Sequence, residues 1–305
     1  MTNEWELYRS FLSVLREGSL SGAARVLGMA QPTVGRHIAA LERALGLALF
    51  TRSQTGLLPT EAAQALHPHA EAMESTAAAL ERTAASYGDG VRGVVRVTAS
   101  EVIGVEVMPA VITSLRQQYP ELKVELVLSN RVQDLLHREA DIAVRMTQPK
   151  QEQLVARRVG TVELGLHASS DYLARCGEPA TLADLSRHTL IGYDQVSPFV
   201  RAALQRWPQF QRERVALRTD SDVAQLALIR AGAGIGICQN ALARRSTPAL
   251  VRLLPAEFSM LLETWVTMHE DLRDSPRCRV TFDALVQALT AHTDSEAPTS
   301  STGNR

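Results

Sequence analysis

The sequence predicts an α+β protein with a small helical head, one long helix and a larger α/β body. Three observations carry this prediction. Residues 1–60 repeat apolar side chains at helical spacing in short segments, residues 61–87 are rich in alanine, and residues 91–290 alternate β-branched runs with helical patterns. Alanine has the highest helix propensity. The alternation is typical of an α/β architecture with largely parallel strands.

Composition places the chain among globular proteins. It has 305 residues, of which 45% are apolar and 21% charged, which favours two or three domains. No run reaches the length of a membrane span, and the first residues do not resemble a secretory signal, so we expect a cytoplasmic protein without a membrane partner. Cys176, Cys238 and Cys278 are widely separated, and we interpret them as reduced, buried or half-buried thiols.

Charge is distributed unevenly along the chain. The formal net charge of −1 excludes a uniformly basic nucleic-acid coat. Residues 1–60, however, hold six arginines and four glutamates, which gives them +2 and leaves −3 for the rest. The difference is small, but its sign is that of a basic head on an acidic body.

The head has the spacing of a helix-turn-helix. Apolar side chains repeat over residues 7–15 and again over 20–27, which predicts two helices. Gly28 opens a three-residue turn, and Gln31 and Pro32 begin a third helix, where proline is well tolerated. A short helix, a turn with glycine and a longer helix make up the motif.

The third helix has two distinct faces. Its apolar stripe consists of Val34, Ile38, Leu41 and Leu45. Another side holds small or polar residues and two arginines, namely Pro32, Thr33, Arg36, Ala40 and Arg43. Small residues allow close approach to the major groove, and Gln or Arg side chains read base edges. This helix is therefore a candidate recognition helix, with Gln31 at its start.

A predicted hairpin follows the third helix. Apolar runs at 49–50 and 57–58 bracket the polar segment 51–56, in which Arg52 is suitably placed for a phosphate. The predicted DNA-binding residues are Gln31, Pro32, Thr33, Arg36, Arg43 and Arg52. The alternative is that the head is only a packing module and Arg36 a solvated surface charge.

Residues 11–52 resemble the winged helix-turn-helix of LysR-type transcriptional regulators. The resemblance rests on FLSV at 11–14, GSLSGAARVL at 18–27, QPTVGRHI at 31–38, and LFTR at 49–52. It is dense over the first 60 residues and looser beyond. It implies that Gln31, Pro32, Thr33 and Arg36 contact DNA from the recognition helix and Arg52 from the wing. Gly35 stands where the family usually has serine, so the DNA contact of that serine hydroxyl is not expected in this chain.

The alanine-rich segment has a heptad pattern. Leu66, Met73, Leu80 and Tyr87 are seven residues apart, and Ala70, Ala77 and Ala84 lie between them. This a/d spacing predicts a seam between two helices. A recognition helix also needs a partner to reach a second half-site. The resemblance implies dimerisation through this linker helix, so we expect a homo-oligomer, either a dimer or a tetramer. The alternative is that the stripe packs on the chain's own body.

Polar side chains follow the predicted strands of the body. The strands at 94–98, 124–128 and 142–145 are followed or ended by Ser100, Ser129, Asn130 and Arg145. The carboxyl ends of parallel strands meet at one edge of a sheet, so these side chains converge on one crevice. Hydroxyl and guanidinium groups suit a small anion, such as a carboxylate, or a polar metabolite. The alternatives are that the hydroxyls cap helices and that Arg145 makes a structural ion pair.

The resemblance also implies the organisation of the body. It indicates a two-lobed, periplasmic-binding-protein-like effector domain with the effector between the lobes, and it places Pro198 and Phe199 at the cleft. The predicted domains are 1–60 (winged helix-turn-helix), 61–89 (linker helix), 90–291 (effector domain, with lobe I at 90–161 and 266–291 and lobe II at 162–265) and 292–305 (a disordered tail).

The sequence contains no motif that indicates an enzyme. The glycines at 232–236 follow a helix and open a strand, the reverse of a dinucleotide-binding turn, and Walker A and HExxH patterns are absent. We therefore predict no catalytic residues, metal or cofactor. The predicted function is transcription regulation by sequence-specific binding to double-stranded DNA with an interrupted dyad, controlled by a small-molecule effector. The alternative is a small-molecule binding protein whose first helices serve only oligomerisation.

Overall fold

The computed structural model describes residues 4–53, 56–84, 90–130, 140–149, 153–195 and 198–294. The chain divides into two compact units, a head unit that comprises residues 1–87 and 134–140 and a body unit that comprises residues 88–133 and 141–305, and each is described by itself. Among the described residues, no helix has the length and apolar character needed to cross a membrane.

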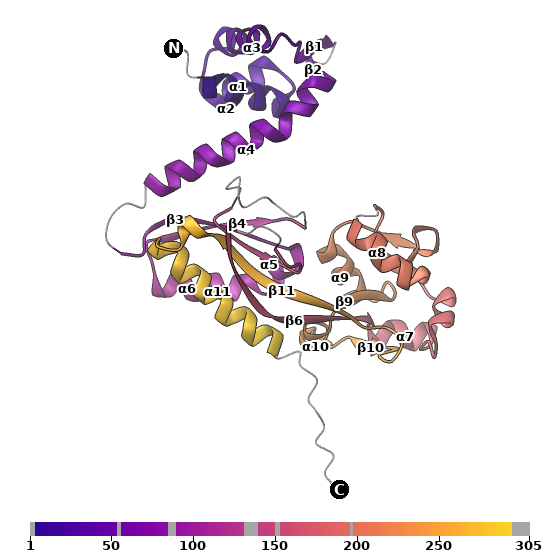
Figure 1. The fold of residues 1–305 in the computed structure, drawn as a ribbon. Coiled ribbons are helices and arrows are strands. Elements are labelled where there is room, and N and C mark those ends of the chain that lie inside the picture. The colour runs from indigo at the N-terminus through magenta and orange to yellow at the C-terminus, as the bar shows by residue number, and fades with distance from the viewer. Residues whose placement is uncertain are drawn as a thin grey trace. The chain divides into compact units, whose positions relative to one another are not determined.

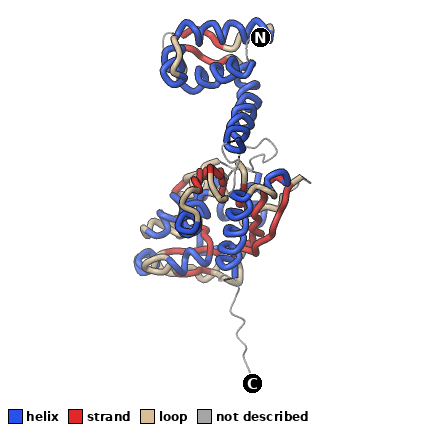
Figure 2. The backbone as a smooth tube through the Cα atoms, turned by 90° about the vertical axis from the view of Figure 1, so that its left-hand side faces the viewer, coloured by secondary structure: helices blue, strands red, loops and turns tan. Residues whose placement is uncertain are grey.

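The head unit is a winged helix-turn-helix (Figures 1 and 2). It consists of α1 (Glu4–Glu17), α2 (Leu20–Leu27) and α3 (Gln31–Leu45), followed by β1 (Phe50–Ser53) and β2 (Gly56–Pro59). The two strands pair antiparallel as a hairpin. The predicted helices, turn and wing are confirmed.

Local chemistry explains where these helices begin and end. Ser19 caps α2, because its hydroxyl accepts a hydrogen bond from Gly22 N. Gly28 ends α2 in the left-handed conformation (φ 65°), which glycine adopts without steric cost. Pro32 lies in the first turn of α3, where its missing N–H leaves no helical hydrogen bond unmade.

One apolar core holds the head together. Val34, Ile38 and Leu41 of the predicted stripe are buried, and Leu45 is partly buried against the same cluster. Phe11 is fully buried, and its ring centroid lies 5.8 Å from that of Phe50 on the wing. The recognition helix and the wing are thus fixed on a common base.

The linker helix α4 (Glu61–Ala84) starts on this core. Thr60 caps it, accepting a hydrogen bond from Ala63 N at 3.2 Å. Ala63 and Ala70 are buried and Leu66 is partly buried against the head, so this half of the stripe packs on the chain itself. Farther along α4, Met73 and Leu80 are exposed, although Ala79 is buried.

The body unit contains a seven-stranded sheet. Its strands are β3 (Gly93–Ala99), β4 (Leu122–Leu128), β5 (Ile142–Arg145), β6 (Leu154–Ala168), β9 (Gly236–Gln239), β10 (Val251–Leu253) and β11 (Met260–His269). Their order is β10-β6-β11-β5-β3-β4, and β9 also pairs with β6. A separate pair consists of β7 (Ile191–Gly192) and β8 (Leu217–Arg218).

The prediction of largely parallel strands is wrong for half of the sheet. β3 pairs parallel with β4 and β5, as expected from successive βα units. β6 pairs antiparallel with β9, β10 and β11, and β11 pairs antiparallel with β5. The cause is that β6 and β11 are long strands that return past each other, whereas the sequence pattern showed only their more apolar ends.

The helices and separate cores define two lobes. Lobe I holds β3–β5 with α5 (Glu101–Glu106), α6 (Met108–Gln118) and α11 (Pro276–Asp294). Lobe II holds β7–β10 with α7 (Ser170–Cys176), α8 (Pro198–Arg206), α9 (Asp222–Arg230) and α10 (Asn240–Arg245). These elements, the long strands β6 and β11 and a few short 3-10 segments build the body (Figure 1).

The structure also tests the expectations for the cysteines and for the C-terminal segment. Cys238 and Cys278 are buried thiols, but Cys176 is exposed, because it ends a short surface helix. α11 runs to Asp294, three residues into the segment expected to be disordered, and Thr293 donates a hydrogen bond from Oγ1 to Val159 O at 2.6 Å. Residues 295–305, the rest of the predicted tail, lie outside the described residues.

Candidate functional site

The predicted DNA-binding side chains lie on the surface of the head. Gln31, Pro32 and Arg36 on α3 are exposed, and Thr33 is half-buried. Arg36 Nη2 donates a hydrogen bond to Thr33 Oγ1 at 3.1 Å, so these two side chains form one polar patch near the start of α3. Arg43, further along α3, and Arg52 on β1 are also exposed.

Two residues that the sequence reasoning did not select hold α3 in place. His37 Nδ1 is hydrogen-bonded to the buried Ser10 Oγ of α1 at 2.8 Å. Glu42 Oε1 accepts hydrogen bonds from Leu49 N at 2.7 Å and Phe50 N at 3.4 Å. These contacts tie the recognition helix to α1 on one side and to the wing on the other.

An apolar groove of about 440 Å³ lies along α4 in the head unit. It is lined by Trp5, His69, Ala72, Met73, Thr76, Ala77 and Leu80. Met73 is 40% and Leu80 62% exposed, although both are large apolar side chains. Of the four predicted seam residues, Met73 and Leu80 are therefore available to a partner, Leu66 packs on the head, and Tyr87 lies outside the described residues.

The body contains a cavity of about 540 Å³ with walls from both lobes. Ser100, Asn130 and Arg145 line it, as the sequence predicts. Ser129 is not among the lining residues, although its backbone N–H donates to Ala99 O at the end of the parallel strands. Pro198 and Phe199 begin α8, but their side chains lie outside the described part of the structure.

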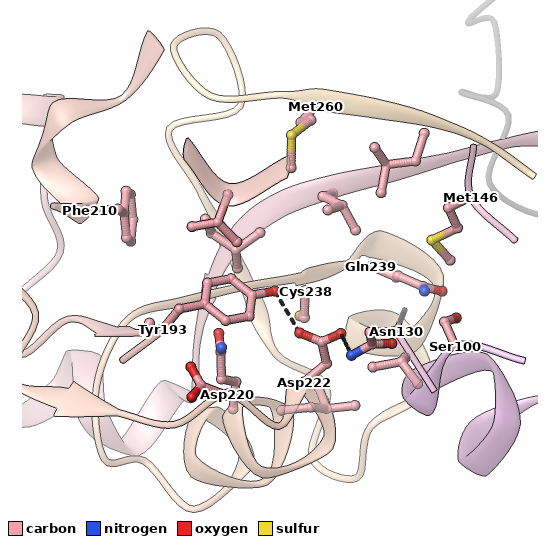
Figure 3. Close-up of a pocket in the computed structure, with 18 of the residues that line it drawn as sticks. Ser100, Asn130, Met146, Tyr193, Phe210, Asp220, Asp222, Cys238, Gln239 and Met260 are labelled. Carbon is pink, nitrogen blue, oxygen red and sulfur yellow. Dashed lines mark hydrogen bonds between the residues drawn. The ribbon is translucent and has the colours of Figure 1, made fainter. Parts of the chain in front are cut away.

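Asp222 is the centre of the polar end of this cavity (Figure 3). Tyr193 donates its hydroxyl proton to Asp222 Oδ1 at 2.5 Å, and Asn130 Nδ2 donates to Asp222 Oδ2 at 2.8 Å. Burial, with Glu101 nearby, raises the pKa of Asp222, and burial beside Asp222 raises the pKa of Tyr193 well above its ordinary value. The sequence analysis did not select Asp222 as a site residue.

Ser100 does not cap a helix, which was the alternative explanation for this hydroxyl. It precedes α5 in the N-cap position, but its hydroxyl makes no capping hydrogen bond. Instead Asn130 Oδ1 accepts from Glu101 N at 3.1 Å. Ser100 Oγ is buried without a hydrogen-bond partner among the described residues, and the same is true of Gln239 Oε1 on the lobe II wall.

Arg145 is anchored to the sheet edge at the cavity. Nη1 donates to Val144 O and Nη2 to Thr98 Oγ1, both at 2.8 Å. Burial lowers the pKa of Arg145 to about 10. At neutral pH the guanidinium is therefore still charged.

Aromatic side chains form the apolar end of the cavity. Trp207 and Phe210 lie against Phe258, with ring centroids 4.5 and 6.0 Å away. All three line the cavity. No periodic pattern brings these residues together, because they come from a short 3-10 turn and from a loop that are far apart in the sequence.

A thiol and an imidazole lie together at the wall, without the charges of a reactive pair. Cys238 Sγ lies 3.3 Å from His167 Nδ1, which also bonds Gly165 O at 3.0 Å. Burial raises the pKa of Cys238 to about 12 and lowers that of His167 to about 4. The thiol and the ring are thus neutral at neutral pH, whereas a nucleophilic cysteine needs its thiolate.

A head that presents an exposed helix and a two-lobed body with a lined cavity define a class: DNA-binding transcriptional regulators with a ligand-binding domain. Two family models match the chain. "Bacterial regulatory helix-turn-helix protein, lysR family" matches residues 5–64, and "LysR substrate binding domain" matches residues 88–290. The chain belongs to the LysR family.

Individual relatives agree with this assignment. An HTH-type transcriptional regulator of Xanthomonas campestris pv. campestris is 31% identical over 62% of this chain and 55% of its own length. The HTH-type transcriptional activator TtdR of Escherichia coli O6:K15:H31 is 27% identical over 93% of this chain and 94% of its own. A crystal structure of full-length CbnR complexed with its target DNA shares the fold, with a TM-score of 0.64 at 20% identity over 93% and 99% of the two chains.

The buried imidazole predicts how stability depends on pH. The pKa of His167 is lowered from 6.5 to about 4 in the folded chain, so between these values only the unfolded chain takes up the proton. We expect the free energy of unfolding to fall as the pH drops from about 6.5 to about 4, by about 1.4 kcal/mol per pH unit for this group. Denaturant unfolding at a series of pH values, followed by tryptophan fluorescence, measures it.

His167→Gln removes this group and should flatten the dependence. His292, also buried and with a pKa lowered to about 4, keeps its own share. The control is Gln117→Ala at an exposed position of α6, which changes no titratable group and should leave the slope as it is. Equal slopes for the wild type and His167→Gln would contradict the burial of a neutral imidazole.

Proposed function

We propose that this LysR-family protein is a ligand-responsive regulator whose paired heads bind an interrupted dyad and whose cavity holds the effector. The observation that carries the proposal is the cavity of about 540 Å³ lined by side chains of both lobes. Its volume is in the range of small-molecule sites, and its walls are mostly apolar with a few polar groups, as such sites are. A molecule in it contacts both lobes at once.

The exposed face of α3 supports the DNA-binding part of the proposal. Arg36 and Thr33 form a polar patch near the start of the helix, with the exposed Gln31 beside them in the sequence. In a helix-turn-helix these positions contact base edges, while a wing arginine such as Arg52 contacts phosphate. Base contacts select the sequence, and phosphate contacts supply much of the affinity.

The groove along α4 supports self-association. Met73 and Leu80 remain exposed, and alanines between them allow a second helix to approach closely. A twofold pair of heads matches a DNA site with dyad symmetry. The competing function, a small-molecule binding protein that does not bind DNA, predicts the same groove but no specific DNA complex.

Arg36→Ala tests the recognition helix. It removes an exposed guanidinium without disturbing the core of the head, so we expect specific DNA affinity to fall about ten- to a hundredfold. Gel retardation on the region upstream of the protein's own gene measures it. The control is Arg9→Ala, which removes the same charge from α1, where Arg9 pairs with Glu6 at 3.7 Å. Unchanged retardation by Arg36→Ala would remove the recognition-helix assignment.

Leu80→Glu tests the groove along α4. The carboxylate would lie in an apolar contact, so we expect monomers in analytical ultracentrifugation. The control is Leu47→Glu, at an exposed leucine in the turn after α3, outside the groove. A dimer that persists in Leu80→Glu would show that the protein associates through another surface.

Leu164→Trp tests the cavity. Leu164 lines it from β6, and the larger ring would fill space that an effector needs. We expect compounds that raise the melting temperature of the wild type, in a panel of acids, amino acids, amines and alcohols, to lose this effect in the variant. Leu261→Trp, at a side chain that is 67% exposed, is the control. Hits that stabilise both variants equally would place the effector elsewhere.

A further inference from the structure

Most side-chain donors at the polar end of the cavity already have protein acceptors. Asn130 Nδ2 and the Tyr193 hydroxyl both donate to Asp222, at 2.8 and 2.5 Å. Gln225 Nε2 donates to Thr219 O at 3.0 Å. The first N–H of α5 is also used, because Glu101 N donates to Asn130 Oδ1. An anionic head would thus have to displace protein acceptors at each of these groups.

Acceptors, in contrast, remain available. Gln239 is only 4% exposed, it lines the cavity, and its Oε1 has no hydrogen-bond partner among the described residues. Asp222 accepts one hydrogen bond on each oxygen, and each carboxylate oxygen can accept a second. Ser100 Oγ is likewise unpartnered in the described part of the chain, and its hydroxyl can accept from a ligand or donate to it. A buried acceptor without a donor is costly, so a ligand that supplies donors gains affinity.

The carboxylates at this end of the cavity also favour a ligand head group that donates hydrogen bonds. Glu101 lies close enough to both Asp222 and Tyr193 that its carboxylate raises the pKa values of these two groups, and Asp220 raises the pKa of Tyr193. Glu101 Oε2 accepts from Ser221 Oγ at 2.9 Å, which holds the carboxylate beside the start of α9. A carboxylate ligand would add a further negative charge here, whereas an ammonium group would be attracted. Two lining cations favour the opposite choice: Arg145 directs N–H groups to Val144 O and Thr98 Oγ1, and Arg212 pairs with Asp194 at 2.7 Å.

The other end of the cavity suits an apolar body. Trp207, Phe210 and Phe258 meet there, and Met260 and Ile237 add to the same lining. Figure 3 shows Phe210 at one end and Ser100 with Met146 at the other, with Tyr193 and Asp222 between them. A small hydrophilic anion would leave this aromatic surface uncovered.

On the premise of the proposed function, we infer that the effector is an amphipathic molecule with a ring-sized apolar body and a hydrogen-bond-donating head, either a protonated amine or a hydroxyl group. The body contacts Trp207 and Phe258, and the head donates to Asp222 and Gln239 Oε1. This departs from the small carboxylate that the sequence pattern favours.

Three probes that share a phenyl ring and differ in the head group test the inference on the full-length protein. They are 2-phenylethylamine, 2-phenylethanol and phenylacetate, and titration calorimetry at pH 7.5 measures their binding. We expect the amine and the alcohol to bind and phenylacetate to bind at least about tenfold more weakly, since it offers no donor and is repelled. This comparison needs no variant.

Two variants locate the head group. Asp222→Asn should weaken the amine about tenfold or more and the neutral alcohol less, because it removes the charge and keeps the shape. Gln239→Leu should weaken both. Glu263→Gln, which removes a carboxylate from the Arg158 ion pair on β11 outside the cavity, is the control and should change neither.

Other results would overturn the inference. If phenylacetate binds most tightly and Arg145→Gln abolishes its binding, the head group is an anion, while the cavity remains the effector site. If none of the three probes binds but a panel compound is lost in Leu164→Trp, the ligand class is wrong and the proposed function stands. If no panel compound binds in the cavity either, the proposed effector function fails together with this inference.

Discussion

The antiparallel pairing of β6 with β11 is the constraint on which the body depends. β6 has 15 residues, and ten of them, with one irregularity at Thr264 and Trp265, pair with β11 from Leu154–His269 to Leu164–Met260. β5 joins this ribbon at one end, and β9 and β10 join β6 at the other. Both lobes therefore share one hydrogen-bonded ribbon, and the cavity is lined from it by Leu164, Met260 and Leu262.

Features set by near neighbours in the sequence could be predicted. The turn that Gly28 opens and the stripe from Val34 to Leu41 are local signals, and both are found as expected. Strand direction is not local. The apolar runs of β3 and β11 look alike, and only the pairing partner makes one parallel and the other antiparallel, so half of the sheet was predicted wrongly.

The same distinction applies to the cavity. Ser100, Asn130 and Arg145 follow strands in lobe I, and the convergence of strand ends predicts their neighbourhood. Asp222, Gln239 and Trp207 come from lobe II, and no spacing relates them to lobe I. Their roles depend on the tertiary fold, which brings Asn130 Nδ2 within 2.8 Å of Asp222 Oδ2 although the two residues are 92 positions apart in the sequence. The sequence analysis therefore identified the lobe I wall, which contains Arg145, and missed the lobe II wall, which contains the acceptors of Asp222 and Gln239. This explains why it favoured an anionic ligand.

The bridges between the lobes limit what an effector can do. In addition to Asn130 and Asp222, Ser221 contacts Glu101 at 2.9 Å, and Arg230 makes two hydrogen bonds to Glu106 at 2.6 and 3.0 Å. All of these join α9 of lobe II to lobe I without a ligand. An effector changes the balance between two arrangements only by the difference in its affinity for them. The second acceptor position on each Asp222 oxygen and the unpartnered Gln239 Oε1 are not used by these bridges, so the proposed effector can bind them without breaking a bridge.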